Sequence, residues 1–349
     1  MKINFLVPHL CIGGGVKAVI YYTNGLSRRG HNVTLICPEK DFILRSKMNL
    51  IRAKPKWINI EADVKYVGSF NKRHIPDGDI IIGSDWSTAN CIKVCPPSKG
   101  KKFYFAQHYE SLFHGPSNEV DKIYNYPMKF IAISTWIKDT LKEKFNVDSE
   151  FIVTPVDFEK FYPTRDGYNK DKRILMLHHD FEWKGVKDGL IVFEMVKREF
   201  PKIELVMFGV RKEKIDINCE YHYNPTQDKL VDIYNSCDIF LWPSWGEGLG
   251  MPPMEAMACK CALVTTDTGG GREYAIDGTT ALVSPPRNPE ALFNNLKRLL
   301  MDEELLKRIA ENGYNYIKRF KWEDAIVKME RMFEESLRKL IFMEKARAK

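Results

Sequence analysis

The chain has 349 residues, of which 44% are hydrophobic and 28% charged, a composition typical of a soluble globular protein and not of a disordered or fibrous one. This length allows two domains of ordinary size, each with its own core. No apolar run approaches the roughly 20 residues of a membrane-spanning helix. Because residues 1–5 also lack the features of a signal peptide, we expect a cytoplasmic protein.

The net charge of +7 is distributed unevenly along the chain. Residues 1–155 carry a formal charge of +8, and the remainder carries −1. A basic N-terminal half predicts an anionic partner, such as a phospholipid surface or a phosphorylated acceptor. No zinc finger or RNA-binding signature is evident, so we expect no nucleic-acid partner.

In the first half of the chain, short apolar runs rich in β-branched residues alternate with helical patterns. This alternation predicts a parallel sheet wrapped by helices. A helix from about Gly15 to Arg29, closed by Gly30, is expected between the first two strands. The predicted strands are residues 3–7, 32–37, 64–67, 79–84, 103–107, 129–133 and 151–154.

A second series of strands is predicted at residues 173–177, 203–208, 238–242, 261–266 and 281–284. The polar, turn-rich residues 163–172 between the two series are interpreted as an interdomain connection, and the chain beyond Phe320 is expected to be helical. We predict two Rossmann-like domains, residues 1–160 and 161–321, with a final helix at about 322–349. Ligands of such sheets bind at the C-terminal ends of the strands.

The glycine-rich residues 8–18 follow the first predicted strand. Gly14 and Gly15 suit a loop whose backbone borders a phosphate or a sugar. The spacing from Gly13 to Ala18 also fits a dinucleotide-binding fingerprint, for which Glu39 would be the acidic partner. Both interpretations remain open from these residues alone.

Two further stretches of the first half also have alternative interpretations. Basic and apolar residues are interleaved at positions 45–57, which predicts either a solvated loop or a contact with an anionic membrane that presents a lipid-linked acceptor. Asp77-Gly78-Asp79 spells a metal-binding triplet, but it directly precedes Ile80 and is interpreted as a turn entering a strand. The eight cysteines, which include the pairs Cys91/Cys95 and Cys259/Cys261, complete no set of four metal ligands, so we expect buried thiols and no metal centre.

In residues 175–185 a strand ends in a loop that delivers Lys184 to the start of a helix. A lysine at this position can stabilise the charge of a diphosphate leaving group. His178, His179 and Asp180 are adjacent on the chain and point in alternating directions, which argues against a shared metal ion.

Residues 243–259 combine a buried strand, a glycine-rich turn and a helix that opens near Pro252. The glycines let the backbone approach an anion, and the amides at the start of the helix favour a phosphate. Glu247 lies in the turn and Glu255 eight positions later in the helix, so both side chains can face one ligand.

The whole string 243–259 is similar to the signature of retaining family-four glycosyltransferases of the GT-B fold. Residues 262–285, 104–110 and 132–163 extend the resemblance, which is weakest over residues 39–100. It implies two Rossmann-like domains that face a central cleft, with the last helix packed on the N-terminal domain. The family usually has an arginine five positions before the lysine; in this chain His179 occupies that position, so either His179 or another cation, Arg211 or Arg272, would replace it.

The resemblance also implies roles for single residues. Glu255 would bind the ribose of the donor, and the amides of Gly248, Leu249 and Gly250 would contact its diphosphate. Glu247 and His108 would lie near the transferred sugar. The donor site would thus comprise Gly14, Gly15, His179, Lys184, Glu247, Gly248, Leu249, Gly250 and Glu255, with His108, Glu247 and Lys184 as the catalytic set.

These expectations define a metal-independent enzyme that moves a hexose-type sugar, with retention, from a UDP- or GDP-sugar to a glycan or lipid-linked acceptor. The nucleotide sugar is a co-substrate, and no cofactor is expected. The alternatives are another enzyme of the same fold (a nucleotide-sugar epimerase or a sugar-phosphate synthase), an NAD-dependent dehydrogenase and a non-catalytic nucleotide-sugar binder.

Overall fold

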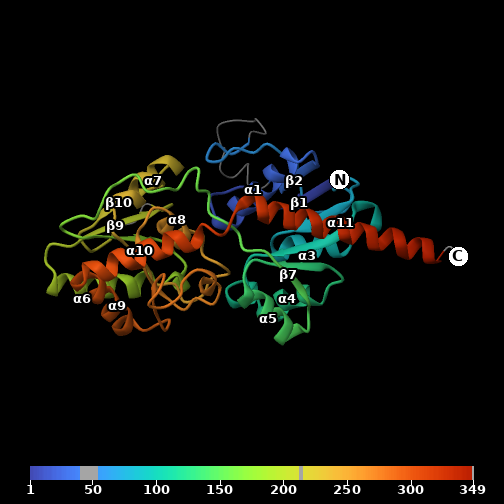
Figure 1. Cartoon of the computed structure of the whole chain (residues 1–349). Helices are drawn as coiled ribbons and strands as arrows, with labels where there is room; N and C mark the ends of the chain where they lie inside the picture. The colour runs from blue at the N-terminus through green and yellow to red at the C-terminus, as the bar shows by residue number, and fades with distance from the viewer. Residues whose placement is uncertain (40–53, 212–214, 348–349) are drawn as a thin grey trace. The chain divides into compact units, whose positions relative to one another are not determined.

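The computed structural model describes residues 1–39, 54–211 and 215–347, with side chains through residue 338. It divides into two compact units, whose helices and strands are labelled in Figure 1. Unit 1 comprises Met1–Thr154 and Glu323–Lys349, and unit 2 comprises Pro155–Trp322. Each unit contains a parallel sheet with helices, as the alternating sequence patterns predict.

The sheet of unit 1 has seven strands in the order β3-β2-β1-β4-β5-β6-β7. The strands are β1 (Lys2–Leu6), β2 (Asn32–Pro38), β3 (Asp63–Val67), β4 (Ile80–Gly83), β5 (Lys101–Ala106), β6 (Lys129–Ala132) and β7 (Ser149–Phe151). The helices are α1 (Gly14–Arg28), α3 (Trp86–Lys93), α4 (Ser117–Asp121), α5 (Thr135–Phe145) and α11 (Trp322–Arg347), with 3-10 turns η1 (Pro97–Lys99), η2 (Glu110–Leu112) and η3 (Lys122–Asn125). Central strands are buried along their length, which explains their unbroken apolar sequence.

The sheet of unit 2 has six strands in the order β10-β9-β8-β11-β12-β13. The strands are β8 (Arg173–Leu177), β9 (Glu204–Gly209), β10 (Glu220–Tyr223), β11 (Ile239–Trp242), β12 (Ala262–Thr266) and β13 (Leu282–Ser284). The helices are α6 (Val186–Glu199), α7 (Gln227–Asn235), α8 (Met251–Ala258), α9 (Pro289–Met301) and α10 (Glu303–Ile317), with 3-10 turns η4 (Glu182–Lys184) and η5 (Gly270–Glu273). In both units the first strand lies inside the sheet and later strands add on its two sides, which is the doubly wound order of a Rossmann fold. The prediction of two Rossmann-like domains is therefore confirmed.

Helix α11 belongs to unit 1, although it follows unit 2 in the chain. Glu330 on this helix contacts Arg29 and His31, each at 2.7 Å. The ring of Phe333 packs edge-on against Phe103 of β5, with ring centroids 5.0 Å apart. These contacts make α11 part of the core of unit 1.

Each predicted strand overlaps a strand of the structure, and one strand was not predicted. Strand β10, with the sequence Glu-Tyr-His-Tyr, lies at the edge of its sheet and pairs only with β9. An edge strand is covered on fewer sides than a central strand, so β10 can carry polar residues. It therefore lacks the unbroken apolar run from which buried parallel strands are predicted.

Residues 163–172 lie within unit 2, whereas the sequence favoured an interdomain connection there. The segment is held by Asp238, which is fully buried just before β11. Arg165 contacts the Asp238 carboxylate at 3.1 Å, and the backbone N–H of Asn169 donates to it at 2.9 Å. A buried carboxylate requires such partners, so these turn-rich residues are a structural part of the unit. The chain passes from one unit to the other between Thr154 and Pro155.

In the part of the chain that the structure describes, no helix has both the length and the apolar content needed to span a membrane. The basic stretch predicted at 45–57 falls mostly outside the described residues. Of its described side chains, Lys54 donates to the carbonyl of Ile60 at 2.6 Å and Trp57 to that of Leu10 at 3.0 Å. Both are engaged by their own chain, and contact with a membrane stays a prediction.

All eight cysteines lie among the described residues as free thiols, and six of them are buried. Across the described ranges, no three side chains of His, Cys, Asp or Glu gather as a group able to hold a metal ion. The pairs Cys91/Cys95 and Cys259/Cys261 are buried in their units.

Candidate active site

The candidate site of unit 2 lies at the carboxyl ends of β8, β11 and β12. Strands β8 and β11 are neighbours in the sheet, and the order of connection reverses between them. Such a switch point leaves a crevice in which open α/β sheets bind their ligands. The loop after β8 carries Lys184 and the loop after β11 carries Glu247.

Lys184 and Glu247 form an ion pair across these two loops. The Lys184 Nζ lies 2.7 Å from Oε1 and 3.0 Å from Oε2 of Glu247. The side chains are only 18% and 8% exposed, so water screens the pair weakly. The ammonium also lies over the ring of Trp242, 5.4 Å from its centroid, and the Ser244 hydroxyl is 2.7 Å from Glu247 Oε1.

Close backbone packing positions the lysine loop against the strand end of β11. Gly185 has a φ of +63°, and a Cβ there would lie 2.0 Å from the carbonyl oxygen of Pro243, so glycine is required. The carbonyl of Trp183 accepts a hydrogen bond from the N–H of Trp245 at 2.7 Å. Because these contacts join the two loops next to the ion pair, the position of Lys184 is set by backbone geometry.

A third loop, after β12, supports Glu247 from the other side. The N–H of Glu247 donates to the Thr268 carbonyl at 2.9 Å, and the N–H of Gly270 donates to the Glu247 carbonyl at 3.1 Å. A Cβ on Gly270 would lie 2.0 Å from the carbonyl oxygen of Gly248, which explains the glycine at that position. The glutamate is thus held by its backbone as well as by its side chain.

The glycine-rich turn leaves donors for an anion at the start of α8. Among the described residues, the structure records no acceptor for the backbone N–H groups of Gly248, Leu249 and Gly250, and Gly248 and Leu249 are buried. Gly250 has a φ of +89° and caps α8. Buried amides at the positive end of a helix form a site that attracts phosphate.

Glu255 lies on α8 and is 5% exposed. The hydroxyl of Tyr234 donates to its Oε2 at 3.1 Å. Burial and the nearby Glu255 raise the pKa of Tyr234 well above its ordinary value, so the phenol keeps its proton. Tyr234 therefore orients the carboxylate of Glu255, the residue of α8 that the sequence predicts to be part of the site.

His179 is a neutral side chain in this site. Its Nδ1 accepts a hydrogen bond from the N–H of Phe181 at 3.1 Å, and burial together with the nearby Lys184 lowers its pKa to about 4. Its contact with a ligand would thus not change with pH near neutrality. The two other cations considered from the sequence are each paired with an aspartate, Arg211 with Asp180 at 2.9 Å and Arg272 with Asp267 at 2.7 Å.

The predicted residues of unit 1 lie at the carboxyl ends of β1 and β5. Gly14 and Gly15 begin α1, and a Cβ on Gly15 would lie 3.2 Å from the Gln107 side chain. His108 follows Gln107, with its ring 5.0 Å from that of Phe113. Unit 1 therefore brings its three predicted residues to one edge of its sheet, and unit 2 does so for His179, Lys184, Glu247, Gly248, Leu249, Gly250 and Glu255.

Unit 1 also contains a buried carboxyl group that sequence reasoning did not single out. Glu110 is 5% exposed; it accepts hydrogen bonds from the N–H of Trp86, at 2.9 Å, and from the Tyr104 hydroxyl. Burial and the nearby Asp85 raise the pKa of Glu110 to about 8. At neutral pH this carboxyl is mostly protonated and joins the β5 loop to the start of α3.

Comparison with known proteins gives a family-model match over part of the chain and a fold for the whole of it. Residues 158–316 match the family model described as glycosyl transferases group 1. An uncharacterized glycosyltransferase of Methanocaldococcus jannaschii is 28% identical over 220 residues, which are 59% of each chain. The N,N'-diacetylbacillosaminyl-diphospho-undecaprenol alpha-1,3-N-acetylgalactosaminyltransferase of Campylobacter jejuni is 31% identical over 177 residues, 45% of this chain and 46% of that protein. The chain thus spans about half the length of the curated relatives it matches.

Solved structures extend the comparison to the whole fold. Sucrose-phosphate synthase of Thermosynechococcus elongatus has a TM-score of 0.79 at 15% identity, covering 96% of this chain and 98% of that one. HepE of Anabaena, solved with UDP-glucose, has a TM-score of 0.75 at 14% identity and covers 97% and 100%. These likenesses establish the GT-B fold.

Proposed function

We propose, from the match of residues 158–316 to the family model of glycosyl transferases group 1, that this chain transfers a sugar from a nucleotide diphosphate to a glycan or lipid-linked acceptor. The observation that carries this proposal is the pair of Lys184 with the buried Glu247, beside the open amides at the start of α8. A cation and free amides together suit a diphosphate, and a carboxylate beside them suits the hydroxyls of a sugar.

In the proposed reaction, the amides of Gly248, Leu249 and Gly250 bind the donor diphosphate and Glu255 binds the ribose. Lys184 exchanges part of its contact with Glu247 for the phosphate oxygens, on which negative charge develops as the glycosidic bond breaks. Glu247 then accepts hydrogen bonds from the sugar. His179 contributes its Nε2–H as a neutral donor, because Nδ1 is occupied by the Phe181 N–H.

The resemblance supports a retaining, metal-independent transfer of a hexose-type sugar, with UDP or GDP as the nucleotide. His108, with Gly14 and Gly15, would border the sugar from unit 1. Retention would follow from attack on the same face as the leaving group, with the departing phosphate taking the proton of the acceptor hydroxyl. No side chain is assigned as a covalent nucleophile.

The acceptor is proposed to carry phosphate. The name of the Campylobacter jejuni relative includes a diphospho-undecaprenol acceptor, and a relative from Streptomyces bingchenggensis, 31% identical over 113 residues, is named D-inositol 3-phosphate glycosyltransferase. The charge of +8 on residues 1–155 favours such an anionic acceptor. A location at the cytoplasmic face of a membrane would suit a lipid-linked form of it.

The proposal is tested by the melting temperature in the presence of UDP-, GDP-, dTDP- and CDP-sugars, with NAD alongside. A ligand that binds only the folded state raises the melting temperature. We expect a shift with one nucleotide class, lost in Glu255→Ala and kept in Glu194→Ala, which removes an exposed glutamate of α6. Sugar transfer to phosphorylated acceptors is then measured with that donor. A shift with NAD alone, or donor binding without transfer or hydrolysis, would contradict the proposal.

A second prediction concerns the position of His179. Because its ring is neutral, His179→Arg adds a cation beside the proposed diphosphate, and a charge-assisted hydrogen bond is worth about 1.5–3 kcal/mol. We expect the dissociation constant of the donor nucleotide to fall by roughly 10- to 150-fold, measured by calorimetry at pH 7. Phe181 would also lose its acceptor, so His179→Asn, which keeps a side-chain oxygen, serves as the control. Unchanged affinity in the arginine variant would show that the diphosphate lies away from position 179.

A further inference from the structure

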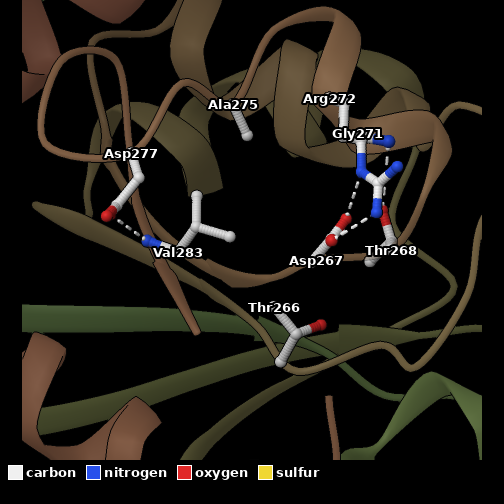
Figure 2. Close-up of a pocket in the computed structure, with 8 residues that line it drawn as sticks. All are labelled: Thr266, Asp267, Thr268, Gly271, Arg272, Ala275, Asp277 and Val283. Atoms are coloured by element: carbon white, nitrogen blue, oxygen red, sulfur yellow. Dashed lines mark hydrogen bonds and ion pairs between the residues drawn. The ribbon is translucent and has the colours of Figure 1, made fainter. Parts of the chain in front are cut away.

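A pocket in unit 2 lies beside the loop that supports Glu247. Its volume is about 160 Å³, and its lining comes from the end of β12, the following loop and β13: Thr266, Asp267, Thr268, Gly271, Arg272, Ala275, Asp277 and Val283. Figure 2 shows Asp267, Thr268 and Arg272 on one side of this pocket, facing Asp277 and Val283 on the other. The residues of the candidate active site are not among its lining.

The polar groups of the pocket are partly satisfied by one another. Arg272 donates from Nε and Nη2 to the two oxygens of Asp267, at 2.9 and 2.7 Å. Asp277 Oδ1 accepts the N–H of Val283 at 2.9 Å. Within the described residues, no partner is recorded for Arg272 Nη1 or for Asp277 Oδ2. The pocket therefore offers one fixed donor group and one fixed acceptor on opposite sides.

The charges of the lining disfavour an ion as the occupant. The charge of Arg272 is already compensated by Asp267, and Asp277 adds a negative charge, so an anion such as phosphate would be repelled. A divalent cation prefers six or more oxygen ligands, and Asp267 is occupied by the arginine. A neutral ligand with hydroxyl groups can use both sides, because each hydroxyl donates to a carboxylate and accepts from an N–H.

The size of the pocket and its apolar lining narrow the class of possible ligand further. The volume is about half of the roughly 300 Å³ at which pockets for drug-sized ligands begin, which suits one sugar ring and excludes a nucleotide. Ala275 and Val283 add a small apolar surface against which the C–H face of a pyranose can pack. The carboxylate and the arginine can bind the hydroxyl groups of a sugar, and the small apolar patch can pack against its C–H face.

We propose that this pocket is a subsite for one neutral sugar unit of a glycan, separate from the donor site. The Thr268 carbonyl accepts the N–H of Glu247, so a sugar held here is one loop away from that glutamate. Binding of a sugar in this pocket does not depend on glycosyl transfer by the enzyme. The interpretation that this sugar belongs to the acceptor or to the product rests on the proposed function.

The subsite is tested by methyl NMR on the full chain labelled at alanine and valine. Glucose, galactose, mannose and N-acetylglucosamine are titrated to tens of millimolar, with inorganic phosphate and Mg²⁺ as separate arms. We expect saturable shifts of the Ala275 and Val283 methyl signals with at least one sugar. Signals that respond to no sugar, or only to phosphate or Mg²⁺, would overturn the proposal.

Variants make the test specific to the pocket. Asp277→Asn keeps an oxygen for the Val283 N–H but replaces Oδ2 with a donor, so sugar binding should weaken about tenfold. Ala275→Leu fills the pocket and should have the same effect, whereas Asp171→Asn, at an exposed position of the same unit, should have none. Equal affinity in Asp277→Asn and wild type would contradict the subsite. Stabilisation by the donor nucleotide, measured in Asp277→Asn, reports separately on the proposed function.

Discussion

Replacement of Lys184 by methionine is expected to lower the transfer rate about 10³-fold and to destabilise the protein by about 3 kcal/mol. The rate falls because the lysine is the cation proposed to stabilise the leaving diphosphate. The stability falls for a different reason: Glu247 is 6% exposed and would remain as a buried charge without its counterion. Transfer rates and urea unfolding at pH 7 measure the two effects on the same samples.

A second substitution separates these two effects. Lys184→Met combined with Glu247→Gln removes the uncompensated charge, so the free energy of unfolding should recover most of the loss while the rate stays low. Lys187→Met, at an exposed position one turn away on α6, should change neither quantity. A double variant no more stable than Lys184→Met would mean that the unpaired charge of Glu247 is not what destabilises the single variant. A wild-type rate in Lys184→Met would remove the lysine from the mechanism.

Glu110→Gln is expected to stabilise the protein increasingly as the pH rises. The native pKa of Glu110 is about 8, whereas an unfolded glutamate has a pKa of 4.5. Between these values the folded state holds a proton that the unfolded state has released, so the wild-type free energy of unfolding falls as pH increases. The full difference is about 5 kcal/mol, from roughly 1.4 kcal/mol per pH unit. Glutamine stays neutral and avoids this loss.

The measurement is the free energy of unfolding of both proteins in urea at pH 5, 7 and 9. Glutamine still offers an oxygen to the Trp86 N–H, so the variants should be of similar stability at pH 5 and diverge above it. Glu143→Gln, at an exposed position of α5 in the same unit, should show no such trend. A stability difference of the same size at pH 5 and pH 9 would contradict a protonated Glu110.

Periodicity predicts most of this fold because strands buried on both faces leave unbroken apolar runs. It fails where burial is partial or where a contact is distant. Edge strand β10 lacks the run, and residues 163–172 have the composition of a linker although Asp238, some 70 positions away, binds them inside unit 2. A turn-rich segment and a domain connection have the same local sequence signature, and only the distant partner distinguishes them.

The site shows the same limit. Glycines and helix starts in residues 243–259 locate the amide donors, and the strand end before Lys184 locates the lysine. Their direct contact could not be predicted, because Lys184 and Glu247 are 63 positions apart. Ser244, Trp242 and Tyr234 were missed for a related reason: each acts through a side-chain contact that leaves no periodic signal. Glu110 lies within residues 104–110, which carry part of the family resemblance, but nothing in the local sequence predicts its burial.

Because α11 belongs to unit 1, the two units are completed in different ways during synthesis. The ribosome completes unit 2 as one continuous stretch, whereas the surface around Phe103 that α11 covers is made early and closed late. At roughly 5–20 residues per second, that surface waits on the order of 10–50 s for its helix. We therefore expect nascent chains of this protein to expose part of the core of unit 1 during that period, which would make this surface a binding site for chaperones.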